Sequence, residues 1–120
     1  MSKKIMLVDD AAFMRMMIKN TLQQNGYTDI LEAENGEKAF ALYSAEKPHL
    51  ILMDITMPVM DGLEALKNLK EMDESVKVVM CSAMGQEAMV VEALKLGAKD
   101  FIVKPFKPDR IMKTVNGILG

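Results

Sequence analysis

Short apolar runs alternate along the chain with longer segments in which apolar residues recur every three or four positions. The short runs are typical of strands, and the longer periodic segments are typical of amphipathic helices. The predicted strands are Ile5–Val8, Asp29–Ala33, Leu50–Met53, Val76–Met80 and Phe101–Val103. The predicted helices are Ala12–Asn25, Gly36–Glu46, a helix beginning at Asp61, Gln86–Leu96 and a helix beginning at Pro108.

The regular alternation of strand and helix predicts an α/β fold. Strands made almost wholly of apolar residues are buried on both faces, and helical crossovers between them require parallel neighbours. The expected architecture is a three-layer, doubly wound sandwich with a five-stranded parallel sheet between two layers of helices. Asp29–Ala33 carries more polar residues than the other strands, which suits a sheet edge.

The apolar positions of the first helix predict which of its sides faces the core. Met14, Met17, Ile18 and Leu22 fall on one side and are expected to pack inward. Phe13 lies off that side and next to the end of the first strand. It is therefore predicted to be exposed and to contact a partner protein.

Composition narrows the class of protein. The chain has 120 residues, half of them hydrophobic, which fits a single domain over residues 1–120 with its own core. The net charge is −2 and there is no basic run, which argues against nucleic acid as a partner. No apolar run reaches membrane-spanning length, and Met1–Lys4 lacks the features of a signal peptide. A lone cysteine, Cys81, favours a reducing compartment, so a cytoplasmic protein is expected. We also expect the protein to be a monomer.

Polar residues stand at the carboxyl ends of four predicted strands, where ligands bind in parallel α/β sheets. They are Asp9 and Asp10 after the first strand, Asp54 after the third, Ser82 after the fourth and Lys104 after the fifth. Each has an ordinary explanation alone: a cap, a solvated turn or a surface charge. Their coincidence at one edge of the sheet favours a functional site.

The residue types at this edge indicate phosphoryl chemistry. Three carboxylates in one crevice repel each other, and a hard divalent cation with oxygen ligands relieves that repulsion. Mg²⁺ is therefore the expected cofactor, with Mn²⁺ as a substitute. Lys104 supplies a second positive charge and Ser82 a hydroxyl donor. Asp54 then acts as a carboxylate nucleophile toward phosphorus and forms an acyl phosphate.

Motifs along the whole chain resemble the response-regulator receiver family, and most closely its single-domain members that act in chemotaxis. They are Val8-Asp9-Asp10, Met53-Asp54-Ile55-Thr56-Met57-Pro58-Val59-Met60-Asp61-Gly62, Cys81-Ser82-Ala83, Gly97-Ala98-Lys99-Asp100-Phe101 and Lys104-Pro105-Phe106. The resemblance implies a flavodoxin-like fold with strand order 2-1-3-4-5. It also implies a receiver domain with no output domain attached.

The resemblance assigns a role to each residue of the site. Asp54 matches the phosphoacceptor. Asp10 and Asp54 match side chains that bind Mg²⁺, Asp9 assists through water, and the backbone carbonyl of Thr56 is a further ligand. Ser82 and Lys104 match the residues that bind the phosphoryl group, and the Lys104–Pro105 peptide bond matches one that is cis in the family.

The resemblance also implies a readout surface. Phe101 matches the switch aromatic, which moves inward with Ser82. Tyrosine is more usual there, and Phe101 lacks its hydroxyl, so steric coupling is expected. The readout surface comprises the fourth helix, fifth strand and fifth helix. Its expected contact residues are Val91, Lys95, Lys99, Phe101 and Lys107, with Phe13 as a separate contact for a kinase or phosphatase.

The implied function is a signalling switch rather than an enzyme. A histidine kinase would donate the phosphoryl group, and the target would be a flagellar motor switch protein. A phosphorelay intermediate of the sporulation type stays open as an alternative, and a phosphatase with an aspartate nucleophile is a more distant one. A flavin protein is disfavoured, because Asp9 and Asp10 would repel the flavin phosphate. A cysteine enzyme is disfavoured too, since His49 and Cys81 fall at opposite ends of neighbouring strands.

Overall fold

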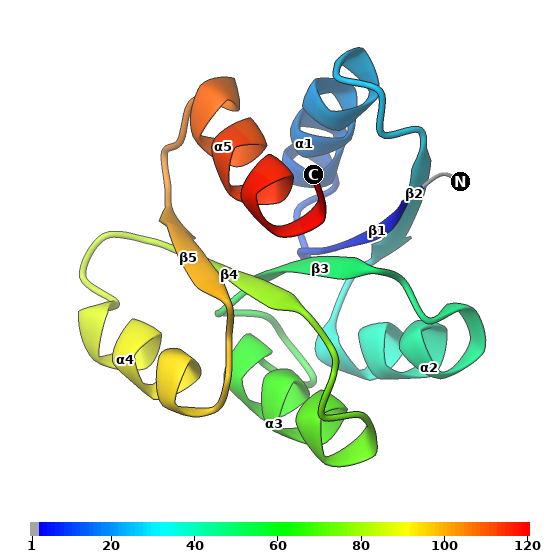
Figure 1. Cartoon of the computed structure of the whole chain (residues 1–120). Helices are drawn as coiled ribbons and strands as arrows, with labels where there is room; N and C mark the ends of the chain where they lie inside the picture. Colours follow the sequence, from blue (N-terminus) through cyan, green and yellow to red (C-terminus); the bar gives the residue numbers. More distant parts are fainter. Residues whose placement is uncertain (1–2) are drawn as a thin grey trace.

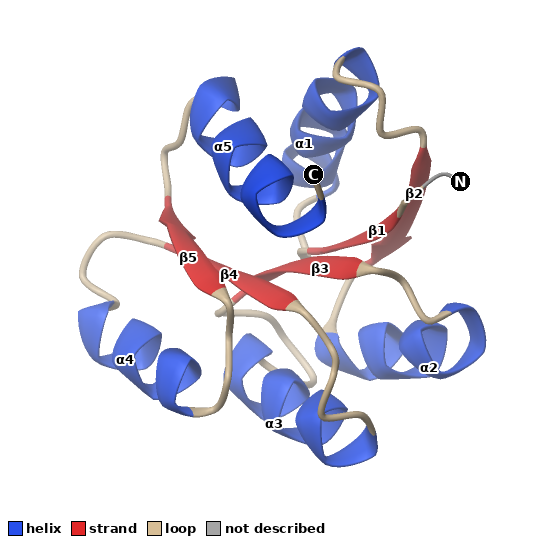
Figure 2. Cartoon of the chain, in the orientation of Figure 1, coloured by secondary structure: helices blue, strands red, loops and turns tan. Residues whose placement is uncertain are grey.

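The computed structural model describes residues 3–120 and contains one parallel sheet between two layers of helices (Figure 1, Figure 2). The first two residues of the expected domain lie outside the described range. The strands follow the order β2-β1-β3-β4-β5. Their bounds are β1 Lys4–Val8, β2 Asp29–Ala33, β3 Leu50–Asp54, β4 Val78–Ser82 and β5 Asp100–Val103. The predicted doubly wound fold and strand order are therefore confirmed, with β2 at an edge.

The helices divide between the two faces of the sheet (Figure 2). One face is covered by α1 (Ala12–Gln24) and α5 (Pro108–Leu119). The other is covered by α2 (Gly36–Glu46), α3 (Gly62–Met72) and α4 (Glu87–Lys95). This arrangement leaves the carboxyl edge of the sheet open to the loops that follow each strand.

The central strands send alternate side chains into two separate cores. On β1, Ile5 and Leu7 enter the core under α1 and α5, whereas Met6 and Val8 enter the core under α2, α3 and α4. All four side chains are almost completely buried. Burial on both faces explains why the strand is a continuous apolar run rather than an alternating one.

The predicted range of the fourth strand, Val76–Met80, is wrong by two residues at each end. The Asp73 carboxylate accepts hydrogen bonds from the backbone N–H and the hydroxyl of Ser75, at 3.0 and 2.6 Å. Val76 donates its N–H to the carbonyl of Asp73, so it closes this turn although its side chain is buried. The sheet pairing continues instead through Cys81 and Ser82.

The predicted burial of Met17 is also wrong, since its side chain is 39% exposed. The buried residues of α1 are Ile18 and Leu22, which lie four positions apart and thus on one line of the helix. Met17 precedes Ile18 and lies about 100° around the helix from it. The inward stripe of α1 is therefore narrower than the periodicity of its methionines indicates.

The remaining predicted boundaries agree with the structure to within one residue. Asp61 caps α3 rather than beginning it, because its carboxylate accepts the N–H of Glu64 at 2.9 Å. Gly26 follows the end of α1 with a φ of 92°, a conformation that suits glycine. Within residues 3–120, no helix has the length and apolar character needed to cross a membrane.

Candidate functional site

The register of the parallel strands brings the polar strand ends together. Val8 pairs with Met53, so the residues that follow them, Asp9 and Asp54, lie side by side. Asp54 in turn pairs with Cys81 on β4. The last pair of β4 and β5 joins Ser82 to Val103, which precedes Lys104. The edge that the sequence predicts therefore exists as one continuous rim.

Three carboxylates form the centre of this rim. Asp9, Asp10 and Asp54 each offer an oxygen, and these oxygens lie within 4.8 Å of one another. Asp9 is buried, Asp54 is partly buried and Asp10 is exposed, so the group extends from the interior to the surface. Such an all-oxygen donor set fits a hard divalent cation such as Mg²⁺ rather than zinc or copper.

The Lys104 ammonium lies between two of these carboxylates. Its Nζ is 3.0 Å from Asp9 Oδ2 and 3.3 Å from Asp54 Oδ1. Its backbone N–H donates to the carbonyl of Ser82 at 2.7 Å, which holds the residue beside the end of β4. The next peptide bond, Lys104–Pro105, is cis. One cation thus partly neutralises three negative charges in this structure.

The electrostatics of the rim follow from burial and from this excess of negative charge. Burial raises the pKa of Asp54, Asp9 and Asp10 add to the rise, and Lys104 opposes it. Burial acts to lower the pKa of Lys104, but its hydrogen bond to Asp9 and the charge of Asp54 outweigh burial, so this pKa is raised. An additional cation would relieve the repulsion on Asp54.

The orientation of Asp9 is held by its neighbours. Its Oδ1 accepts the N–H of Ala11 at 2.9 Å, while its Oδ2 receives Lys104. Its backbone carbonyl accepts a hydrogen bond from Arg15, whose Nε donates to Glu32 at 2.9 Å. With both carboxylate oxygens engaged, Asp9 is less available than Asp10 to bind a metal directly. The sequence analysis missed Arg15, because only the position of β2 brings Glu32 beside it.

Gln86 is a second residue that the sequence analysis missed. Its Oε1 accepts the N–H of Ala83 at 2.6 Å, and its Nε2 donates to the Thr56 hydroxyl at 2.8 Å. It therefore joins the loop after β4 to the loop after β3, both of which border the carboxylates. In the sequence Gln86 is only a polar residue at the start of a helix, and no local signal marks this contact.

The predicted switch residues lie on the two strands at this side of the sheet. Ser82 ends β4 and is 1% exposed. Phe101 lies on β5, is partly buried and packs against the core under α2, α3 and α4. Its backbone carbonyl accepts a hydrogen bond from Arg110 at 2.8 Å. Phe101 is therefore neither fully enclosed in the core nor fully exposed.

The residues predicted to contact partners are exposed, except Phe101, which is partly buried. Phe13, on α1, is 66% exposed beside the carboxylates. Val91 and Lys95 on α4, Lys99 before β5 and Lys107 before α5 are exposed as well. Because α1 and α4 cover opposite faces of the sheet, Phe13 lies across the sheet from Val91 and Lys95 (Figure 1).

The structure gives no support to a cysteine nucleophile. Burial raises the pKa of the Cys81 thiol to about 12, so a reactive thiolate is not formed at neutral pH. His49 lies at the far end of the sheet, just before β3, where its Nδ1 accepts the N–H of Lys4 at 2.9 Å.

Comparison with known sequences identifies close relatives over the full length of the chain. It is 54% identical to the chemotaxis protein CheY of Bacillus subtilis over 120 residues, which cover all of both proteins. It is 51% identical to the chemotaxis protein CheY of Thermotoga maritima over 118 residues, which cover 98% of each.

Solved structures show the same fold. A CheX-CheY-BeF3-Mg²⁺ complex from Borrelia burgdorferi matches with a TM-score of 0.93 and 33% identity, covering 98% of this chain and 90% of that one. The receiver domain of NtrX from Brucella abortus matches with a TM-score of 0.92 and 32% identity, covering 97% and 98%. The family model described as "Response regulator receiver domain" matches residues 5–116. The chain therefore belongs to the response-regulator receiver family.

Proposed function

We propose that this chain is a phosphorylation-dependent signalling switch that accepts a phosphoryl group on Asp54 from a histidine kinase. The observation that carries the proposal is the position of Asp54, whose carboxylate lies close to those of Asp9 and Asp10 and to the ammonium of Lys104. Family membership supports it, because receiver domains are phosphoacceptor switches.

Mg²⁺ is the proposed cofactor, with Mn²⁺ as a substitute. Asp10, Asp54 and the backbone carbonyl of Thr56 would hold the ion directly, and Asp9 would assist through water. The engagement of both Asp9 oxygens supports this division. When bound, the ion neutralises negative charge on the carboxylates and on the transferring phosphoryl group.

Transfer requires Asp54 to act as a nucleophile. A carboxylate oxygen of Asp54 bonds to phosphorus, the bond between phosphorus and the imidazole nitrogen of the kinase breaks, and that nitrogen keeps the electron pair. Lys104 lies 3.3 Å from Asp54 and is placed to contact the phosphoryl oxygens as charge builds up on them. The protein contributes position and charge rather than a separate acid or base.

The signal arises from the new charge on Asp54. The Ser82 hydroxyl and the Lys104 ammonium bind the phosphoryl oxygens, and Phe101 packs into the space beside Ser82. The surface formed by α4, β5 and α5 then changes its affinity for a target. Couplings of this kind typically amount to about 1–3 kcal/mol, or several-fold to a hundredfold in affinity.

The proposed target is a flagellar motor switch protein, because two close relatives are chemotaxis proteins named CheY. The solved relative bound to CheX supports a further partner of that kind, for which Phe13 is an exposed contact candidate. The proposed compartment is the cytoplasm, since a reducing environment suits the free thiol of Cys81. The proposed activity is limited to the acceptance and loss of a phosphoryl group on Asp54, without turnover of other substrates.

The test is phosphorylation by a small phosphodonor. The protein is incubated with Mg²⁺ and acetyl phosphate, and its intact mass is measured. One phosphoryl adduct is expected with Mg²⁺ and none with EDTA. Asp54→Ala should abolish the adduct, whereas Asp109→Ala, which changes an exposed aspartate on α5, should retain it. An adduct that survives Asp54→Ala would show that another residue carries the group.

The target is tested separately from the chemistry. Binding of a purified flagellar motor switch protein is measured with and without acetyl phosphate. Lys95→Glu with Lys99→Glu should weaken binding of the phosphorylated form severalfold while leaving adduct formation unchanged. Equal binding by both forms would contradict the switch without affecting the assignment of Asp54.

A further inference from the structure

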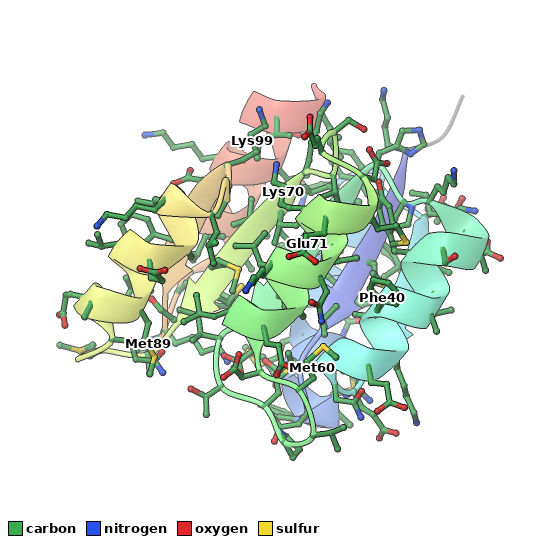
Figure 3. All side chains as sticks on the ribbon, turned by 90° about the horizontal axis from the view of Figure 1, so that it is seen from below. Phe40, Met60, Lys70, Glu71, Met89 and Lys99 are labelled. Carbon is green, nitrogen blue, oxygen red and sulfur yellow. The ribbon has the colours of Figure 1, made fainter. Side chains whose placement is uncertain are left out.

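An open groove of about 400 Å³ lies between α2 and α3, on the face of the sheet opposite α1 and α5. Its lining consists of Glu37, Phe40, Met60, Asn68, Glu71 and Met72. Figure 3 labels Phe40, Met60 and Glu71 along the seam between the two helices. None of these residues belongs to the carboxylate rim or to the proposed readout surface.

The groove follows the second half of α3. Met60 stands just before α3, but its sulfur lies 3.6 Å from the side-chain nitrogen of Asn68, in the middle of the helix. The lining residues on α3 run from Asn68 to Met72, the last residue of the helix, which is about 6 Å at 1.5 Å per residue. An apolar groove of this length between two helices can receive the apolar side chains from about one turn of a bound helix.

The walls of the groove are apolar and adaptable. Phe40 and Met60 are partly buried and continue outward from the core under α2, α3 and α4. Met72 is 39% exposed at the far end. Methionine side chains at a surface can adjust to the side chains of a bound helix, because they are flexible and polarisable.

Met60, at the base of the groove, is held by hydrogen bonds and close packing. The carbonyl of Met60 accepts the N–H of Gly36 at 3.1 Å, and its sulfur accepts a hydrogen bond from Asn68 at 3.6 Å. A side chain at Gly36 would meet the Met60 carbonyl at 2.8 Å, so the start of α2 is packed tightly against this residue. Binding would therefore require little rearrangement of the backbone.

The charged residues of the lining are both acidic. Among residues 3–120, neither Glu37 nor Glu71 takes part in an ion pair, as is also true of Glu64, Glu74, Glu87 and Glu92, so both carboxylates of the lining are available to a partner. Glu37 lies in the first turn of α2, where the helix dipole favours a carboxylate. Glu71 lies in the last turn of α3, where the dipole disfavours one, so helix stability does not explain its presence.

We propose that this groove binds a short amphipathic helix of a partner protein. Its apolar side chains would pack against Phe40, Met60 and Met72, and its lysines or arginines would pair with Glu37 and Glu71. The commitment to a cationic partner rests on the matching charge of the groove. The surface is separate from the site of phosphorylation, so the inference does not depend on the proposed function.

The probe for the test is a short synthetic helix with leucines along one face and lysines flanking them. Its binding to the full chain is measured by fluorescence anisotropy, and the contact is located from shifts of backbone amide signals. The largest shifts are expected at Phe40, Asn68 and Met72. A peptide with glutamates in place of the lysines should bind roughly tenfold more weakly or worse, because like charges then meet.

Matched pairs of charge reversals test the position of the contact. Glu37→Lys with Glu71→Lys should weaken the lysine peptide roughly tenfold or more. The control is Glu87→Lys with Glu92→Lys on α4, which alters net charge equally and should leave affinity within about twofold. Equal weakening by both pairs, or weakening by the α4 pair alone, would overturn the proposal.

The apolar contact has its own pair of variants. Met72→Ser should weaken the peptide severalfold, whereas Met89→Ser, at a similarly exposed methionine on α4 away from the seam, should not. Thermal melts check that all variants remain folded. If the chain alone forms a dimer that Glu71→Lys dissociates, the groove is covered by a second copy, and the proposal of a separate partner is wrong.

Discussion

At the scale of a single residue, the environment of Asp54 opposes the ionisation that its proposed role requires. In the function proposed above, Asp54 must be ionised to attack phosphorus, yet burial and the neighbouring carboxylates make its ionised form unfavourable. Lys104 supplies only part of the compensation, since it is shared with Asp9. An ionised Asp54 therefore lowers the stability of the metal-free protein, and perturbed carboxylates of this kind are common at functional sites.

This cost predicts that Asp54→Asn stabilises the metal-free protein near neutral pH. A carboxyl whose pKa is higher in the folded chain than in the unfolded chain binds its proton more tightly when the chain is folded. Its full contribution to the free energy of unfolding is therefore present only below the unfolded pKa. That contribution is lost as the pH rises through the folded pKa. The variant should therefore melt a few degrees higher at pH 7 in EDTA.

The same argument predicts how the difference depends on pH. The increase in melting temperature of Asp54→Asn should shrink as the pH falls through the folded pKa of Asp54. It should vanish below about pH 4, where the carboxyl is protonated in both the folded and the unfolded chain. Thermal melts over a pH series in EDTA provide the measurement. A gain that stays constant down to acidic pH would show that repulsion at Asp54 is not its cause.

Val59 is a second residue with a local conflict. Its φ is 69°, in the left-handed region that β-branched residues rarely adopt, and its side chain is 74% exposed. We expect Val59→Asn to raise the free energy of unfolding by about 1 kcal/mol, because asparagine tolerates this conformation. Urea unfolding measures the change. Val91→Asn, at an exposed valine within α4, is the control and should not stabilise the protein.

At the scale of elements, close packing determines which glycines can be replaced. A Cβ at Gly36 would lie 2.9 Å from the Cβ of Ala65 and 2.8 Å from the Met60 carbonyl. At Gly117, inside α5, a Cβ would meet nothing within 4 Å. The two glycines are alike in the sequence, and only the contacts between α2 and α3 distinguish them.

We therefore predict opposite effects of the same substitution. Gly36→Ala should destabilise the protein by about 1–3 kcal/mol through overpacking. Gly117→Ala should stabilise it by roughly 0.5–1 kcal/mol, because alanine favours the helical conformation. Urea unfolding of both variants gives the comparison. Similar changes in both would mean that the start of α2 can shift to make room.

The elements also differ in how well local pattern predicts them. The bounds of β2 and α2 match the predicted ranges, since a glycine or a turn marks each end. The bounds of β4 do not match, because the turn at Asp73 includes the apolar Val76 and the sheet continues through the polar Ser82. Hydropathy agrees with the burial of Val76 but not with that of Ser82, and strand pairing at both positions depends on the neighbouring strands.

At the scale of the whole molecule, metal binding is linked to global stability. An ion that binds only the folded chain stabilises it by mass action, about 2.7 kcal/mol at a hundred times its Kd. We expect Mg²⁺ to raise the melting temperature by several degrees and EDTA to reverse the rise. Asp10→Asn should remove most of the response, while Asp109→Asn should keep it. An unchanged response in Asp10→Asn would exclude Asp10 as a ligand.

The sequence by itself determined the fold class, the positions of most elements and which polar residues lie at the carboxyl edge of the sheet. This was possible because a strand buried on both faces and an amphipathic helix have different periodicities. In addition, a parallel sheet places all its carboxyl strand ends at one edge. Asp9, Asp10, Asp54, Ser82 and Lys104 were predicted from that rule and from their resemblance to a family.

Only the tertiary structure decided the contacts between residues that are distant in the chain. It placed Lys104 between Asp9 and Asp54, brought Gln86 to Thr56 and Arg15 to Glu32, and turned Met17 outward. It also formed the groove between α2 and α3, whose walls come from separate elements. These features depend on strand register and helix packing, which join residues without any local pattern.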